Sequence, residues 1–131
     1  MPLSLKEARR YADGAIERAS SMGIRISVAV VDELGQLVQM DRMDGARLMG
    51  PDIAEAKART ALNFQQPTSA VAARFASNPE FQRDLQEIVN FKLFARPGGL
   101  PIMRDGMIFG AIGVSGGTPE EDEQVATAAL G

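Results

Sequence analysis

Two stretches that alternate in hydrophobicity and then turn back on themselves constrain the fold of this chain of 131 residues more than any other feature. The first covers residues 24–43, with a turn at 32–36 between two strands. The second covers residues 102–114, with a turn at Asp105-Gly106. Strands that a hairpin joins run antiparallel. The sequence therefore predicts an antiparallel sheet.

Helical periodicity fills most of the remaining chain. Capping-box patterns at residues 4–7 and 118–121 begin a first helix, which ends at Gly23, and a last helix, which reaches the C-terminus. A middle helix is expected over about residues 50–64, and two shorter helices follow it. No linker or repeat interrupts the pattern. We therefore expect one α+β domain over residues 1–131, with helices packed on an antiparallel sheet.

The residues that the chain lacks exclude several classes of protein. It contains no Cys, which excludes a disulfide framework, a thiolate nucleophile and a zinc ribbon, and no His, which excludes a Ser-His triad and histidine-ligated haem. The net charge of −3 does not favour a nucleic-acid partner, and no apolar run approaches the roughly 20 residues that span a bilayer. The N-terminus lacks an apolar secretory core. We expect a cytoplasmic protein without a metal site, a nucleic-acid partner or a membrane partner.

One lysine lies on the apolar side of the middle helix. On a helical wheel, Lys57 falls among Ile53, Ala54, Ala61 and Phe64. Either its ammonium reaches solvent past the small alanines, or it points into a pocket between elements. A buried ammonium needs a negative partner, because burial without one costs several kcal/mol. The second interpretation predicts an anion or a carboxylate beside Lys57.

Two further charges interrupt apolar patterns. Strand alternation places Arg42 on the face of Val38 and Met40, where its planar guanidinium suits a carboxylate, and the nearby Asp44 is the alternative, structural partner. Asp122 shares a side of the last helix with apolar residues, although an acid in the first turn also favours the helix N-terminus. Together with Lys57, these residues are the candidate charged groups of a site.

Glycine-rich junctions supply a second part of the candidate site. Gly98-Gly99 and the segment Gly113–Gly117 lie where predicted elements meet. Glycine permits close approach of the backbone, and consecutive exposed N–H groups can hold an anion. Such loops also serve as ordinary turns, and no GxGxxG or P-loop motif accompanies them.

These residues belong to a pattern that covers nearly the whole chain in order. Its segments are Ser27–Asp32 with Gly35, Arg42–Ala46, Ala56–Ala61, Gly98–Ile102, Gly110–Gly117 and Glu121–Glu123. The combination of Arg42–Ala46 with Gly110–Gly117 is the specific part. The pattern resembles the GlcG/HbpS-like family, which includes the C-terminal domain of PduO-type corrinoid adenosyltransferases.

The resemblance implies a profilin-like αβα sandwich, with a five-stranded antiparallel sheet and helices on both sides. It also implies a homo-oligomer, either a dimer, a tetramer or an octamer. Some members bind haem, several of them through a histidine that this sequence lacks, and others are encoded beside glycolate, diol or aromatic-acid catabolism. The family's motif positions fall here on Asp32, Arg42, Asp44, Lys57, Gly99, Gly117 and Asp122.

The first function that we consider is an intracellular binding protein for a small anion, either haem or an organic acid. Arg42 and Lys57 would pair with the carboxylates, with Asp44 in the same ligand-binding set, and the backbones of Gly99 and Gly117 would close around the ligand. This hypothesis predicts that Lys57→Ala lowers the affinity for the ligand at least about tenfold, or ~1.4 kcal/mol.

Two alternatives remain open. In the first, the chain is an enzyme that acts on a small carboxylate or aromatic-acid breakdown product. Lys57 would act as a base or form a Schiff base, Arg42 would orient the carboxylate and Asp122 would transfer a proton. In the second, the chain is a structural or accessory subunit whose inward charges pair with one another across a subunit interface. A salt bridge of Lys57 with Asp44 or Asp122, with no cavity beside it, would favour this alternative.

Overall fold

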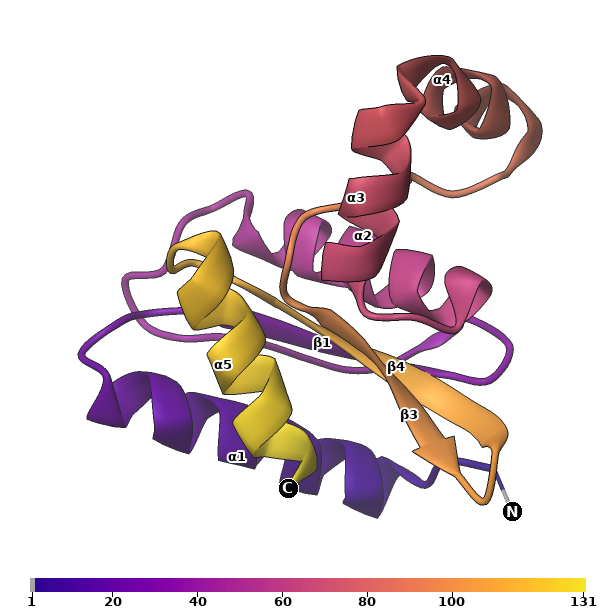
Figure 1. Ribbon diagram of the computed structural model, residues 1–131. Helices are drawn as coiled ribbons and strands as arrows, with labels where there is room; N and C mark the ends of the chain where they lie inside the picture. The colour runs from indigo at the N-terminus through magenta and orange to yellow at the C-terminus, as the bar shows by residue number, and fades with distance from the viewer. Residues whose placement is uncertain (1) are drawn as a thin grey trace.

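Helices and strands follow one another along the chain as the two hairpins and the capping patterns predict (Figure 1). The computed structural model describes residues 2–131. The helices are α1 (Leu5–Ser21), α2 (Gly50–Phe64), α3 (Thr68–Ser77), α4 (Pro79–Ile88) and α5 (Pro119–Leu130), and the strands are β1 (Ser27–Asp32), β2 (Leu37–Arg42), β3 (Gly99–Arg104) and β4 (Met107–Ser115). Both predicted capping boxes form, at Ser4 and at Thr118. None of the helices described is long and apolar enough to cross a bilayer.

The sheet is antiparallel throughout and has the strand order β2-β1-β4-β3. Within residues 2–131 it has four strands, so the expectation of five was wrong. The two hairpins supply two strands each, and the chain between them folds into α2, α3 and α4 and the loops that join them. β2 and β3 therefore form the two edges of the sheet.

A β-bulge breaks the alternation of side chains in β2. Val30 pairs with Gln39 and Val31 with Leu37, so Val38 is the extra residue. Val38 packs against the core beneath α1. Arg42 pairs directly with Ser27, whose hydroxyl faces Gly50 at the start of α2. Because paired residues project to the same face, Arg42 and Val38 lie on opposite faces, contrary to the uninterrupted alternation we assumed.

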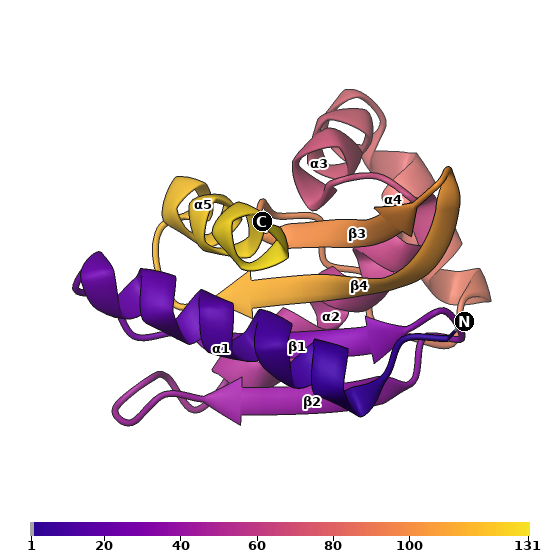
Figure 2. The ribbon, with the colours of Figure 1, turned by 90° about the horizontal axis from the view of Figure 1, so that it is seen from below.

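Helices cover both faces of the sheet, as predicted (Figure 2). α1 and α5 pack on one face, and α2 packs on the other, chiefly over β4, β1 and β3. The larger core cluster joins the alanines of α1 to Val28, Val30, Ile112 and Val114. On the opposite face, Ala58 and Ala61 of α2 meet Val31 and Ala111. Small side chains let α2 approach so closely that a Cβ at Gly113 would overlap the Ala54 carbonyl.

α3 and α4 form an arm that extends from the α2 side of the sandwich (Figure 1). The arm has its own apolar cluster around Val71, Phe75 and Leu93. Thr68, the first residue of α3, connects this arm to the first residue of β3 through hydrogen bonds. Its Oγ1 donates to Arg96 O (2.6 Å) and accepts from Gly99 N (2.8 Å). The loop that leads into β3 is thereby held against the first turn of α3.

Candidate functional site

Lys57 and Asp122 form a buried ion pair. Lys57 Nζ lies 3.0 Å from Asp122 Oδ2, and the two side chains are 3% and 5% exposed. The ammonium also donates to Val114 O (2.8 Å), at the end of β4. The second oxygen of the carboxylate, Oδ1, accepts from Gly117 N (2.8 Å). Lys57 is therefore buried, and the carboxylate beside it comes from the chain itself.

The pair joins two helices on opposite faces of the sheet, since Lys57 belongs to α2 and Asp122 to α5. The contact is made at the last residues of β4, next to the chain that enters β3. Asp122 lies in the first turn of α5, where the helix dipole favours an acid. The capping box at Thr118 fixes this turn, and so places the carboxylate.

The predicted glycines surround this pair closely. Gly98 has φ +130°, and a Cβ there would lie 2.7 Å from Val114 O and 2.9 Å from Lys57 Nζ. A Cβ at Gly99 would lie 2.5 Å from the carbonyl oxygen of Lys57. The Gly117 N–H, which was predicted to contact a ligand, donates a hydrogen bond to Asp122 Oδ1. In this structure the glycines allow the backbone to pack against the ion pair.

Burial shifts the pKa values of Lys57 and Asp122 in opposite directions. It lowers the pKa of Lys57, and the Asp122 charge opposes this while the charge of Arg96 adds to it. Burial likewise raises the pKa of Asp122, against the attraction of Lys57 and the hydrogen bond from Gly117. Burial therefore favours the uncharged form of each group, whereas their mutual attraction and the hydrogen bonds with Val114 O and Gly117 N stabilise the ionised forms.

Arg42 and Asp44 are not brought to this pair. Arg42 is exposed at the end of the edge strand β2, and its Nη1 donates to Ala46 O (3.0 Å). Asp44 is exposed in the loop that follows. Among residues 2–131, no ion pair joins these two side chains. Of the predicted site residues, the structure brings together Lys57, Asp122, Gly99 and Gly117.

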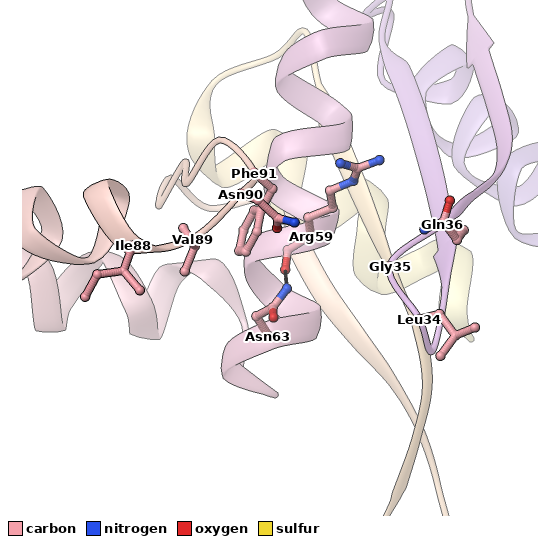
Figure 3. Close-up of a pocket in the computed structure, with 9 residues that line it drawn as sticks. All are labelled: Leu34, Gly35, Gln36, Arg59, Asn63, Ile88, Val89, Asn90 and Phe91. Atoms are coloured by element: carbon pink, nitrogen blue, oxygen red, sulfur yellow. Dashed lines mark hydrogen bonds between the residues drawn. The ribbon is translucent and has the colours of Figure 1, made fainter.

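A pocket that the sequence analysis did not predict lies on the outer side of α2. We call it the Arg59 pocket; its volume is about 480 Å³. Its lining residues are Leu34, Gly35, Gln36, Arg59, Asn63, Ile88, Val89, Asn90 and Phe91. Figure 3 shows Arg59 and Asn63 between the β1–β2 turn on one side and the chain after α4 on the other. The one local signal was the polar face of α2, on which Arg59 and Asn63 lie.

A family model described as haem-degrading protein HbpS-like matches residues 3–131. The chain belongs to the HbpS-like family. The sequence resemblance to GlcG/HbpS-like proteins is thus confirmed, and the α+β sandwich seen here is the fold of HbpS-like structures.

Three relatives illustrate how far the similarity extends. A double mutant of HbpS from Streptomyces reticuli is 36% identical, with a TM-score of 0.89 over 99% of this chain and 86% of that one. A crystal structure described as a PduOC:heme complex is 28% identical, with a TM-score of 0.88 over 99% of this chain and 94% of that one. Protein GlcG of Escherichia coli K12 is 34% identical over 86% of this chain and 81% of its own length. The similarity therefore includes all elements that build the site.

Proposed function

We propose that this HbpS-like chain is a binding protein for a small organic anion, and that haem is the first candidate. The observation that carries the proposal is the match, over 99% of this chain, to a domain crystallised with haem. The family model that matches the chain is described as a haem-degrading protein, which supports the same ligand. A role beside small-acid or aromatic catabolism, a cytoplasmic location and assembly into a homo-oligomer stay predictions.

The residues present fit the carboxylates of haem better than they fit its iron. The chain has no His or Cys. Among the other side chains able to ligate iron, Met43 Sδ accepts from Ile26 N and Tyr11 is buried and accepts from Arg104, while Met49, Met103 and Met107 are exposed. No Met or Tyr lines the Arg59 pocket. Arginine, by contrast, pairs well with a propionate, and Arg42 is exposed.

This argument makes a prediction about the metal. If the propionates and the porphyrin face provide the binding energy, protoporphyrin IX without iron should bind to the protein within about threefold of hemin, or ~0.7 kcal/mol. Protoporphyrin IX dimethyl ester, with both carboxylates blocked, should bind about tenfold more weakly or worse. Absorbance titrations of the three compounds decide the matter. Hemin binding far tighter than protoporphyrin would show that a protein atom ligates the iron, and would overturn this mode of binding.

The assignment of Arg42, Asp44, Lys57, Gly99 and Gly117 to the ligand stays a prediction. Lys57 already has Asp122 and Val114 O as partners, so a ligand carboxylate would have to replace Asp122 at the ammonium. Arg42 needs no such displacement. We therefore expect Arg42→Gln to weaken hemin binding about tenfold. Arg47→Gln, a change at another exposed arginine, serves as the matched control.

An enzyme remains the second candidate, because burial lowers the pKa of Lys57 and an uncharged lysine can attack a carbonyl carbon. In that reaction Nζ forms a C=N bond with a keto acid and water leaves. Asp122 lies beside Lys57 and keeps its predicted role as proton shuttle, whereas Arg42 is not brought to Lys57 and does not clamp the carboxylate there. Incubation with pyruvate and borohydride should then add a stable mass to Lys57. If no keto acid in a panel is trapped, the Schiff-base mechanism is wrong.

A further inference from the structure

We propose that the Arg59 pocket binds a small carboxylate with an apolar body. The inference rests on the proposed function, because it gives the binding of an organic acid a location and a ligand class. It uses none of the residues that the sequence analysis assigned to a ligand.

The pocket has the size of a small-molecule site, and its surface is more polar than apolar. Its volume of about 480 Å³ lies within the usual range of roughly 300–1,000 Å³. Apolar side chains stand on both sides of it, Leu34 on the β1–β2 turn and Ile88 at the end of α4 (Figure 3). These two side chains are 77% and 80% exposed, so they present apolar surface that a ligand can cover. A bound apolar group would remove part of this surface from water.

The wall formed by the β1–β2 turn is held in place before any ligand binds. Asp32 Oδ1 accepts from Leu34 N (3.0 Å) and from Gln36 N (2.9 Å). Gly35, between them, has φ +80°, which this tight turn requires. The turn thus has a defined shape, so little conformational entropy is lost there on binding.

The opposite wall, formed by the chain after α4, is fixed in a similar way. Gln86 Nε2 donates to Phe91 O (2.8 Å), and Gln86 Oε1 accepts from Leu93 N (2.8 Å). Thr60 Oγ1, on α2, accepts from Phe94 N (3.0 Å). The chain that carries Phe91 is therefore tied both to α4 and to α2.

Arg59 supplies the charge that a carboxylate would recognise. Its Nη2 lies 2.6 Å from Glu55 Oε2, while its buried Nε has no hydrogen-bond partner. The guanidinium therefore still has a donor without a hydrogen-bond partner, and the Arg59 side chain is 32% exposed. A ligand carboxylate that displaced Glu55 could accept from both Nε and Nη2. The Glu55 carboxylate therefore competes with the ligand carboxylate for the Arg59 guanidinium.

The neighbouring charges favour a singly charged acid over a polyanion. A second hollow of about 400 Å³ adjoins the pocket through Arg59, and it is lined by Lys92 but also by Asp52 and Glu55. These two acids would repel additional negative charge. The side chain of Asn63, which donates to Arg59 O (2.8 Å), still offers its amide oxygen and second N–H to the ligand.

Benzoate and hexanoate test the proposal, with benzamide and hexanamide as uncharged analogues of the same shape. We expect the acids to bind to the wild-type protein in calorimetric titrations and to shift the side-chain amide signals of Asn63 and Asn90 in NMR spectra. The amides should bind about tenfold more weakly. Arg59→Gln should lose about tenfold in affinity for the acids, whereas Glu55→Gln should gain about threefold, because the competitor loses its charge. Arg47→Gln should change nothing.

Failure of this inference can be told apart from failure of the proposed function. If hemin binds and neither acid does, the pocket has the wrong ligand class and this inference is overturned, while the proposed function stands. Binding of the acids that is unchanged in Arg59→Gln overturns the location only. If neither hemin nor the acids bind to the wild-type protein, both are wrong.

Discussion

Lys57 Nζ and Asp122 Oδ2 lie 3.0 Å apart and are contributed by helices on opposite faces of one sheet. The pair is internally satisfied, with Val114 O on the ammonium and Gly117 N–H on the carboxylate. We infer that it holds α2, the end of β4 and the start of α5 together. The accessory-subunit hypothesis expected such a pair across a subunit interface, whereas this one lies within a single chain. Because both charges already have partners, we infer that a ligand binds to other residues.

Removing one charge of this pair should lower the free energy of unfolding, whereas replacing both charges by apolar side chains should not. Lys57→Met leaves a buried carboxylate alone, and Asp122→Leu leaves a buried ammonium alone, so each should lower the free energy of unfolding by about 3–5 kcal/mol. The double variant removes both charges and should recover most of this loss. Urea denaturation of the three variants gives the coupling free energy. Additive losses in the double variant would contradict the interpretation.

The stability of the protein should depend on pH through the same pair. Burial raises the pKa of Asp122 above its ordinary 3.8, so the folded state holds this proton more tightly and stability falls as pH rises from about 3.8 to the raised value. Burial lowers the pKa of Lys57 below 10.5, so the unfolded state binds this proton more tightly and stability rises between the lowered value and 10.5.

The contribution of the pair should therefore have a minimum between the two shifted values. It is measured as the difference in unfolding free energy between the wild-type protein and the Lys57→Met–Asp122→Leu double variant across pH. A difference that is constant with pH, or that is largest near neutrality, would contradict the directions of the two pKa shifts.

Gly98→Ala should destabilise the protein far more than Gly23→Ala. Both glycines have positive φ, +130° and +74°, but a Cβ at Gly98 would press on Val114 O and Lys57 Nζ, whereas a Cβ at Gly23 meets no atom within 4 Å. Backbone strain alone costs about 1–2 kcal/mol, and crowding in a packed site adds about 1–3 kcal/mol. Thermal denaturation of the two variants should show this difference. Equal losses would mean that the chain beside Lys57 can move aside.

Asp32 should affect ligand binding without touching the ligand. Asp32→Ala removes the acceptor for Leu34 N and Gln36 N, and should cost about 1–3 kcal/mol of stability. Benzoate affinity should also fall, by roughly threefold to tenfold, because the turn is no longer preorganised. Asp32→Asn retains an acceptor oxygen and should behave like the wild-type protein. If Asp32→Ala destabilises the protein but binds benzoate normally, the turn does not form a wall of the site.

Much of the fold is visible in local sequence signals. The capping boxes at Ser4 and Thr118 and the turn at Asp105-Gly106 mark their elements directly. The predicted helix over residues 50–64 is confirmed as α2. The fifth strand was expected from family resemblance alone, and no alternating stretch of this sequence supports it.

The site was harder to predict because its contacts are not local. Lys57 and Asp122 are 65 residues apart, and the helical wheel identified each as misplaced without showing that they meet. The bulge separates Val38 from the face that Met40 and Arg42 share, and period-two alternation cannot reveal an extra residue. Arg59 gave only the signal of an ordinary polar face, since its pocket is assembled from three separate segments.

A hemin titration of the wild-type protein beside the Lys57→Met–Asp122→Leu double variant tests most directly whether an anionic ligand is bound away from the buried pair. We predict that both proteins bind hemin, with dissociation constants within about twofold of each other. A loss of about tenfold or more in a folded double variant, or the absence of binding by the wild-type protein, would contradict the account.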